Sequence, residues 1–399
     1  MLTQWKVLDL GMEAGVHINS SQIQSFVVQQ KSVEVCWQDG LTAKFHKTWL
    51  RENCSCEKCF HSKTQQRMVD PANFSEDLSI EEIASHENSV LIVWGDSQGK
   101  QDCRKTVLSS LWLRENRVKR KSEKLLEREL WQGEAIKNFL PQVSYDEFMQ
   151  EDSNSKRVEA LKKLYQYGIL LVSHTPSSEV ATEQFAKRVG LIQASIYGTI
   201  WTTNLSEATT SYLDTASSNC ELQLHTDCSY HIDPPGIQIF NCIAQASVGG
   251  ASRFLDGFAV AQFLRDNEPE TFKFFSEKEL MFQCYDQNVH LKTYAPIIKL
   301  DHKRDVTQVR FNNYDRGPLN HLTFAEIEEF YEHHKVLMKV LQDPARELSF
   351  SLEKKAMIVI DNHRVMHGRY EFTGERTLIG CYLGKNEYDS NLRVLGIIN

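Results

Sequence analysis

Two short motifs far apart in the chain constrain its fold most strongly: His225-Thr226-Asp227, and His367 followed by Gly368-Arg369. Two imidazoles and one carboxylate on one face of a metal ion form the ligand set of mononuclear non-haem iron sites. The opposite face of the metal stays open for a co-substrate and oxygen. The stretch between the motifs is long enough to wind most of a β-barrel. The sequence therefore favours a fold that brings two distant strand ends together around a metal.

The residues before each motif have the pattern of strands. In the segment 222–227 the period is two, so His225 and Asp227 leave the strand on the same side. His367 follows an apolar strand at 357–360 and a short turn at 361–362. Because His-X-Asp triplets also occur by chance, the alternative is a surface histidine at a strand end, paired with a carboxylate.

The composition indicates an ordinary globular protein and excludes some classes of partner. The chain has 399 residues, 41% of them hydrophobic and 25% charged, which gives room for two to three domains. A net charge of −8 argues against nucleic acid or an anionic membrane as a general partner. No apolar run approaches the roughly 20 residues that span a bilayer.

The N-terminal residues resemble neither a secretory signal nor an Arg/Ser-rich mitochondrial presequence. We therefore expect a cytoplasmic protein. The ten cysteines come without a secretory signal, so we interpret them as metal ligands and free thiols and not as a disulfide framework.

A five-residue phrase, Trp-Leu-Arg-Glu-Asn, occurs twice, at 49–53 and at 112–116. Each copy follows a strand-like segment that ends in a turn, at 33–40 and at 90–96. Alternation followed by Asp and Gly is typical of hairpins. We predict a small N-terminal β domain, residues 1–120, built from two related units.

Three cysteines, Cys54, Cys56 and Cys59, lie within six residues directly after the first phrase. Thiols at this spacing can converge on one zinc ion, and a structural zinc site needs four ligands. Cys103 is the preferred fourth ligand and His61 is another candidate. The alternative is three unligated thiols in a loop, which would be liable to oxidation.

The charged run 114–130 has the pattern of a solvated helix, so we expect a helical linker over residues 121–150. The catalytic domain then covers residues 151–399. It begins with a helix-strand-helix unit at 155–191 and is strand-rich to about 320, with a helix at 323–341 and strands at 356–360 and 377–383. This order predicts a mainly β fold with flanking helices, whose core is a double-stranded β-helix, the jelly roll.

Two further features fit a site beside the iron. Arg376 opens the last strand and could clamp a dicarboxylate in bidentate fashion while iron holds the other end. Tyr197 and Trp201 are large aromatics four positions apart, and aromatic faces attract quaternary ammonium groups. The alternatives are a surface arginine and an ordinary aromatic core pair.

The chain resembles the carnitine-biosynthesis dioxygenases, the family of γ-butyrobetaine dioxygenase and trimethyllysine dioxygenase, over nearly its whole length. Ordered motifs carry this resemblance: Trp49-Leu50-Arg51-Glu52-Asn53-Cys54, residues 62–67, Tyr197-Gly198 with Trp201, His225-Thr226-Asp227, Pro235-Gly236-Ile237-Gln238, residues 249–258, Asn312-Asn313-Tyr314-Asp315-Arg316, and Asp361-Asn362 with His367-Gly368-Arg369.

The resemblance implies a role for each matching residue. It makes His225, Asp227 and His367 the iron ligands, and Arg376 the residue that binds the far carboxylate of 2-oxoglutarate. A second set would bind the substrate: Tyr197, Trp201 and Tyr382 as walls of a trimethylammonium cage, Asn313 in the turn 312–316 for the other end, and Asp214 for an α-ammonium group.

The implied activity is Fe(II)- and 2-oxoglutarate-dependent hydroxylation of a trimethylammonium amino acid, with release of succinate and carbon dioxide. Ascorbate as reductant, structural Zn(II) and a homodimer also follow from the resemblance. The motifs at 62–67, 313–316 and 372–383 favour trimethyllysine, hydroxylated at carbon 3, as the substrate. The spacing of Cys54, Cys56 and Cys59 favours γ-butyrobetaine, hydroxylated to L-carnitine. Trimethyllysine dioxygenases are usually mitochondrial, so the mitochondrial matrix is the alternative compartment. The third hypothesis for the function is a non-catalytic protein that binds 2-oxoglutarate or a cation.

Two positions depart from the family pattern. Ser217 stands where the family places a cage tyrosine, after a segment, 204–213, that is longer than the family's; Tyr212 or Tyr230 could replace that wall. Gln98 stands where the family has the fourth zinc ligand, a histidine, and Cys103 could take its place.

Overall fold

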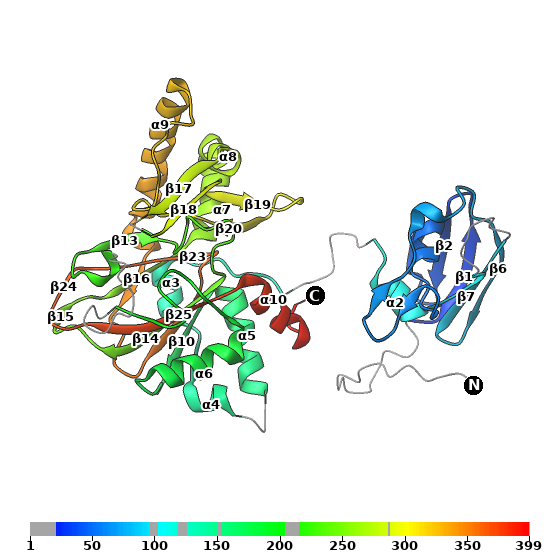
Figure 1. Ribbon diagram of the computed structural model, residues 1–399, viewed down its shortest axis with the longest axis horizontal. Helices are drawn as coiled ribbons and strands as arrows, with labels where there is room; N and C mark the ends of the chain where they lie inside the picture. The colour runs from blue at the N-terminus through cyan, green and yellow to red at the C-terminus, as the bar shows by residue number, and fades with distance from the viewer. Residues whose placement is uncertain are drawn as a thin grey trace. The chain divides into compact units, whose positions relative to one another are not determined.

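The computed structural model describes residues 21–95, 103–118, 126–150, 154–203, 215–285 and 288–398, apart from the side chains of residues 134 and 217. The chain divides into two compact units, Met1–Glu123 and Lys124–Asn399 (Figure 1). None of the helices in these ranges is long and apolar enough to cross a bilayer.

The first unit repeats one arrangement of three antiparallel strands followed by a short helix. The first copy consists of β1 (Ile23–Val28), β2 (Ser32–Trp37), β3 (Thr42–His46) and α1 (Lys47–Glu52), and the second of β6 (Ile80–His86), β7 (Ser89–Trp94), β8 (Lys105–Ser109) and α2 (Ser110–Glu115). Between them lie β4 (Phe60–His61), β5 (Gln66–Arg67) and η1 (Pro71–Asn73). The duplicated phrase is therefore a helix that closes each copy.

Tryptophans join the two copies into one core. Trp37 and Trp94 are fully buried at the ends of the matching strands β2 and β7. The indole N–H of Trp37 donates to Ser110 Oγ at 3.1 Å, which links the first copy to the second. Trp49 and Trp112, from the two copies of the phrase, stack with ring centroids 5.2 Å apart. The predicted small β domain is confirmed.

The second unit is built on two sheets. The larger has the strand order β11-β25-β14-β22-β10-β9, with β12 also paired to β25, and the smaller has the order β13-β23-β16-β21. Their strands are β9 (Gln142–Ser144), β10 (Ile169–Ser173), β11 (Ile192–Gln193), β12 (Trp201–Thr202), β13 (Leu222–His225), β14 (Ile237–Ala244), β16 (Ser252–Asp256), β21 (Leu348–Phe350), β22 (Met357–Asp361), β23 (Val365–Arg369) and β25 (Thr377–Leu383).

The central strand β22 shows how the layers form. All five of its residues are buried. Ile358 and Ile360 face the smaller sheet and pack with Phe254 and Leu348, whereas Met357 and Val359 face helices on the other side. Alternate side chains point to opposite faces of a strand, so an apolar run is buried on both faces only when both are covered.

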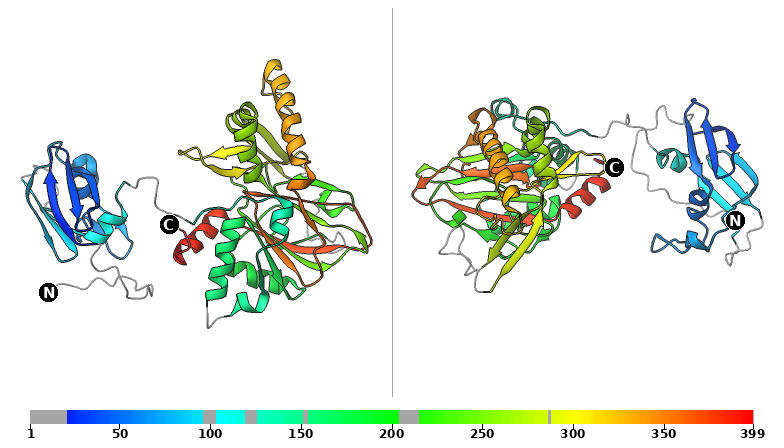
Figure 2. Two further views of the ribbon diagram at one scale, coloured as in Figure 1. Left: turned by 180° about the vertical axis from the view of Figure 1, so that it is seen from behind. Right: turned by 90° about the horizontal axis from the view of Figure 1, so that it is seen from above.

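Helices cover the outer face of the larger sheet. These are α4 (Tyr145–Met149), α5 (Ser155–Tyr167), α6 (Glu179–Val189) and α10 (Lys385–Val394). Figure 2 shows α4, α5 and α6, in green tones, on one side of that sheet. Two facing sheets with helices outside form the predicted mainly β fold with a jelly-roll core.

The remaining elements of the second unit lie outside these two sheets. They are α7 (Gly257–Asn267), α8 (Pro269–Glu277), α9 (Phe324–Leu341), the hairpins β17 (Leu280–Tyr285)–β18 (His290–Ala295) and β19 (Ile298–Leu300)–β20 (Val306–Val309), the pair β15 (Val248–Gly249)–β24 (Phe372–Thr373), η2 (Thr215–Ser217) and η3 (Pro344–Arg346). In Figure 1, α8, α9 and the β17–β18 hairpin project together away from the sheets.

The range expected to be a helical linker has a different structure in its described part. Residues 126–132 form no helix, and 133–149 hold only α3 (Gly133–Lys137), β9 and α4. Trp131 is buried, its indole N–H donates to the carbonyl of Tyr167 at 2.7 Å, and Ile136 lies in the core between the sheets. These apolar anchors attach the segment to the second unit, and the charge pattern at 114–130 gave no sign of them.

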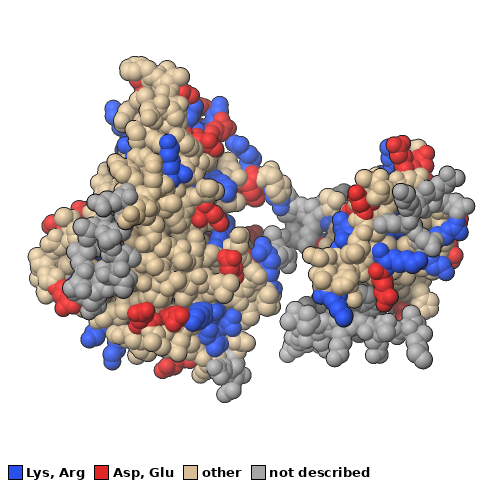
Figure 3. Space-filling view, viewed as in Figure 1, with Lys and Arg blue, Asp and Glu red and all other residues tan. Residues whose placement is uncertain are grey.

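The surface carries charges of both signs. On the described part of the face in Figure 3, Lys and Arg side chains are interspersed with Asp and Glu. This mixture agrees with the modest net charge of −8.

Candidate active site

Two neighbouring strands of the smaller sheet hold the predicted triad. His225 at the end of β13 lies directly opposite His367 on β23. Asp227 follows two residues later, and its Oδ1 lies 3.2 Å from His225 Nε2 and 3.6 Å from His367 Nε2. The possible ligand atoms of the three residues lie within 4.8 Å of one another. Strand pairing thus brings together residues that are far apart in the sequence.

The His225 ring presents one nitrogen to the site. Its Nδ1 lies 2.7 Å from the carbonyl oxygen of Gln223. Because a carbonyl can only accept, Nδ1 carries the proton and Nε2 keeps its lone pair for a metal. The His367 ring packs against Phe240, with centroids 5.2 Å apart. Across the described residues, His367 Nδ1 has no hydrogen-bond partner.

Asp227 is held through both its backbone and its side chain. Its backbone N–H donates to Asn362 Oδ1 at 2.8 Å, and Asn362 Nδ2 donates to the carbonyls of Asp227 at 3.1 Å and Pro235 at 2.9 Å. The carboxylate Oδ2 accepts from the Tyr382 hydroxyl at 2.7 Å and from the Gln238 amide. Oδ1 therefore faces the two imidazoles.

Electrostatics favour the ligand protonation states that a divalent metal requires. Burial by itself raises the pKa of Asp227, but the two imidazoles and the Tyr382 hydroxyl outweigh burial and hold that pKa well below its usual range. Burial, together with the charge of His225, lowers the pKa of His367 to about 3. Burial opposes protonation of His225 as well, but the hydrogen bond and charge of Asp227 raise its pKa. A metal ion would displace that proton.

Two imidazoles and one carboxylate that line one cavity fit a mononuclear Fe(II) centre with open coordination positions. The cavity has a volume of about 290 Å³. Among its lining residues are the triad, Arg369, Arg376, Gln238, Asp315 and four aromatic side chains described below. Arg376 directly precedes β25 and Tyr382 lies near its end, so this strand lines the cavity with both.

Arg376 is a largely buried cation. Its Nη2 makes a long contact of 3.4 Å to Ser252 Oγ, and the guanidinium lies 6.0 Å from the centroid of the Phe372 ring. Burial and the neighbouring charge of Arg369 lower the pKa of Arg376 to about 10, so it stays protonated at neutral pH. Within the described ranges no carboxylate forms an ion pair with it. A buried guanidinium in this setting suits an anionic ligand.

Aromatic side chains form another part of the cavity wall. The rings of Trp201 and Tyr382 lie with centroids 5.7 Å apart, and the hydroxyls of Tyr197 and Tyr230 lie 3.5 Å apart. Trp201 lies against Gly380 of β25, where a Cβ atom would come within 2.4 Å of the indole. The predicted aromatics therefore line the cavity, and Tyr230 joins them.

The structure does not bring every predicted substrate residue to the cavity. Asn313 is exposed and accepts a bond from Arg316 Nε at 3.4 Å. Its neighbour Asn312 lines the cavity instead and donates to Asp315 Oδ2 at 2.8 Å. Ser229 Oγ also donates to Asp315 Oδ2, at 3.0 Å. The turn conformation, which the sequence leaves open, decides which asparagine faces inward.

Some predictions lie outside the described residues: Asp214, Gln98, Tyr212 and the rest of the segment 204–213, and the side chain of Ser217. Three other residues of the site, Gln238, Asn362 and Asp315, stood in the family motifs, but the sequence analysis gave none of them a role of its own. Gln238 gave a signal that could have been used, because it is a polar residue within the apolar strand β14. A buried polar residue needs a partner, and here that partner is Asp227.

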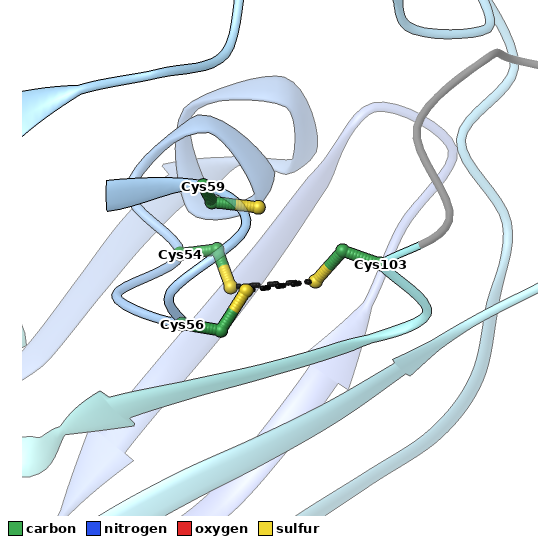
Figure 4. A group of neighbouring side chains, drawn as sticks. All are labelled: Cys54, Cys56, Cys59 and Cys103. Carbon is green, nitrogen blue, oxygen red and sulfur yellow. Dashed lines mark hydrogen bonds between the residues drawn. The ribbon is translucent and has the colours of Figure 1, made fainter. Parts of the chain in front are cut away.

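Four cysteines converge in the first unit. The Sγ atom of Cys103 lies 3.6 Å from that of Cys54 and 3.4 Å from that of Cys56, and Cys59 completes the group (Figure 4). His61, the other candidate, is exposed and bonds to Thr64. The hydrogen bond from Cys103 lowers the pKa of Cys54 to about 5. Four convergent sulfurs, one with a low pKa, suit a tetrahedral zinc ion.

Comparisons with known proteins agree with this architecture. Residues 131–382 match the family model "Taurine catabolism dioxygenase TauD, TfdA family". Residues 25–106 match the model "Gamma-butyrobetaine hydroxylase-like, N-terminal". The crystal structure of a protein named AAD-2, in complex with Mn(II) and N-oxalylglycine, has a TM-score of 0.50 at 14% identity and covers 65% of this chain and 98% of its own. At this identity the likeness concerns the fold alone.

Two relatives match the chain nearly from end to end. Mitochondrial trimethyllysine dioxygenase of Mus musculus is 31% identical over 96% of this chain and 94% of its own length. The γ-butyrobetaine dioxygenase of Pseudomonas sp. (strain AK-1) is 28% identical over 91% and 93%. The TauD, TfdA family model spans the two-sheet core of the second unit, and these relatives span both units. The chain therefore belongs to the TauD/TfdA family and is a 2-oxoglutarate-dependent dioxygenase.

Proposed function

We propose that this protein hydroxylates trimethyllysine, with 2-oxoglutarate and oxygen as co-substrates. One observation carries the proposal: a single cavity combines the His-Asp-His triad, a buried arginine and an aromatic wall. Each of these parts suits a different partner, namely a metal, an anion and a quaternary ammonium group.

In this proposal His225, Asp227 and His367 hold Fe(II), and Arg376 binds the far carboxylate of 2-oxoglutarate. The bound metal supplies the oxygen chemistry. One oxygen atom enters a C–H bond of the substrate and the other enters succinate, while the carboxyl group next to the keto group leaves as carbon dioxide. The contribution of the chain is to orient both organic molecules and to exclude water.

The aromatic wall would hold the trimethylammonium group. Trp201 and Tyr382 are near enough for one cation to contact both rings. A cation over an aromatic face gains about 0.5–1 kcal/mol at exposed sites and about 2 kcal/mol when it is desolvated. Since Tyr382 is buried and Trp201 is half-buried, we expect a gain between these two figures. Anchoring this end would present one carbon of the chain to the metal.

Charge favours trimethyllysine over γ-butyrobetaine. Trimethyllysine carries an α-ammonium group that γ-butyrobetaine lacks. The carboxylate of Asp315 lies in the cavity wall, held by Ser229 and Asn312, and can accept hydrogen bonds from such a group. γ-Butyrobetaine remains the second candidate, since the N-terminal model is named after its hydroxylase.

A paired assay tests the proposal. The purified chain is supplied with Fe(II), ascorbate and 2-oxoglutarate, and with either trimethyllysine or γ-butyrobetaine. We expect succinate and a substrate heavier by one oxygen atom, with higher kcat/KM for trimethyllysine, measured by mass spectrometry. Preference for γ-butyrobetaine would reverse the choice of substrate, and hydroxylation of neither would refute the proposal.

We also propose that Cys54, Cys56, Cys59 and Cys103 hold a structural zinc ion. Their ligand atoms all lie within 4.8 Å of one another, which four-coordinate zinc requires. The guanidinium of Arg51 donates to Cys59 Sγ at 3.4 Å and would offset part of the negative charge of four thiolates.

A further inference from the structure

Tyr382 is the residue in which the aromatic wall and the metal site meet. Its hydroxyl donates to Asp227 Oδ2 at 2.7 Å, while its ring lies 5.7 Å from that of Trp201. The side chain is almost fully buried, with an exposed fraction of 4%. One rigid side chain thus contacts a metal ligand at its tip and lines the cavity with its face.

Gln238 is the cross-strand partner of Tyr382. The two residues lie directly opposite each other on the antiparallel strands β14 and β25, so their side chains leave the sheet on the same face. The Gln238 amide nitrogen also donates to Asp227 Oδ2, and the side chain is completely buried. The opposite amide orientation would place its oxygen against the carboxylate, which would repel it.

The two oxygens of Asp227 are therefore distinguished by their partners. Oδ2 accepts two hydrogen bonds from β14 and β25, and Oδ1 lies 3.2 and 3.6 Å from the imidazole nitrogens. A carboxylate free to rotate could offer a metal either oxygen or both. Because these hydrogen bonds occupy Oδ2, only Oδ1 is available to a metal. The Asp227 carboxylate therefore presents one lone pair in a fixed direction.

We propose that Tyr382, already assigned to the wall of the cation site, is also a positioning residue for Asp227, and that Gln238 shares the positioning role. The hydroxyl of Tyr382 sets the rotation of the carboxylate, and its ring contacts the cation. The part that concerns the cation rests on the proposed function; the part that concerns the metal does not.

Two substitutions separate the roles. Tyr382→Phe removes the hydroxyl and keeps the ring, whereas Trp201→Leu removes a neighbouring wall and leaves Asp227 untouched. Loss of a hydrogen-bond partner to a metal ligand typically weakens metal binding about 10–100-fold. We therefore expect Tyr382→Phe to weaken metal binding by at least about tenfold and to change KM for trimethyllysine by less than about threefold. Trp201→Leu should raise KM for trimethyllysine and leave metal binding unchanged.

Metal affinity is measured with Mn(II), by the loss of the free-ion EPR signal, on the full-length, zinc-loaded chain without substrate. Mn(II) prefers nitrogen and oxygen ligands to thiolates, so it reports the triad. Wild-type affinity in Tyr382→Phe would overturn the inference. Thermal unfolding of the zinc-loaded variants without Mn(II) checks their folding. Tyr230→Phe is the matched control and should leave Mn(II) affinity unchanged, since that hydroxyl contacts Tyr197 and Cys228 and not Asp227.

Gln238→Leu provides an independent variant that keeps the Tyr382 side chain whole. We expect weaker Mn(II) binding here too; should Tyr382→Phe not fold, unchanged binding in Gln238→Leu overturns the inference. The outcome is also separate from that of the proposed function. If neither candidate substrate is hydroxylated but both variants lose Mn(II) affinity, the positioning role stands and the substrate assignment falls.

Discussion

At the level of single residues, Arg376 is the side chain whose surroundings most clearly indicate a ligand. It lines the cavity, and its contact to Ser252 is long. Its guanidinium can form two parallel hydrogen bonds to a carboxylate, which a lysine cannot reproduce.

Single residues also show where prediction from the sequence ends. The expected strand geometry holds only as far as His225, because β13 ends there and Asp227 lies in the following turn. No pattern distinguished Asn312 from Asn313.

Replacing Arg376 tests its assignment. Removing one partner of a buried charged pair costs about 2–5 kcal/mol. We therefore expect Arg376→Met to raise KM for 2-oxoglutarate by about 30-fold or more, measured by succinate formation. Mn(II) affinity serves as the internal control and should stay at the wild-type value. An unchanged KM for 2-oxoglutarate would mean that the co-substrate is anchored elsewhere.

Replacing Asp315 tests the choice of substrate. A hydrogen bond to a charged group contributes about 1.5–3 kcal/mol. Asp315→Asn should therefore lower kcat/KM for trimethyllysine by about tenfold or more and leave kcat/KM for γ-butyrobetaine nearly unchanged, because only trimethyllysine has an α-ammonium group. The two substrates control for each other in one preparation. An equal loss for both would assign Asp315 a structural role.

At the scale of elements, β25 organises the cavity, since Arg376 precedes it and Gly380 and Tyr382 lie within it. Apolar composition over an ordinary strand length predicted this strand and β22. The sequence also predicted α9, expected at 323–341 and found at Phe324–Leu341. Periodicity failed at 126–132, where Trp131 packs into the second unit without any helix. A single anchoring side chain leaves no periodic signal.

Gly380 tests the link between β25 and the aromatic wall. An added Cβ would lie 2.4 Å from both the Trp201 ring and the carbonyl oxygen of Ile239. Gly380→Ala must therefore displace the indole, and overpacking of this kind costs about 1–3 kcal/mol of unfolding free energy. We expect a lower Tm by calorimetry and a higher KM for trimethyllysine, with KM for 2-oxoglutarate unchanged. If KM for trimethyllysine is unaltered, Trp201 is not part of the cation site.

At the scale of the whole molecule, the four-cysteine cluster joins the two copies of the first unit. Cys54, Cys56 and Cys59 follow the helix of the first copy, and Cys103 precedes the last strand of the second. The sequence indicated three of the ligands from their spacing, and it left Cys103 and His61 as alternatives because their distance in space depends on the packing of the two copies.

Zinc should therefore stabilise the first unit specifically. We expect about one zinc ion per chain by elemental analysis, consistent with a closed four-ligand site. Cys103→Ser should reduce zinc content and make residues 21–118 sensitive to protease, while the second unit, which has its own core, stays resistant. His61→Ala is the control and should retain zinc. Full zinc content in Cys103→Ser would contradict the assignment.

If the triad, Arg376 and the aromatic wall act together on one trimethylammonium substrate, as proposed, 2-oxoglutarate turnover must be coupled to trimethyllysine hydroxylation. Succinate and hydroxylated trimethyllysine are measured together in wild type and in His225→Ala. We expect equal amounts of the two products in wild type and neither in the variant. Succinate formation that trimethyllysine does not stimulate, or full turnover in His225→Ala, would show that these parts do not form one active site.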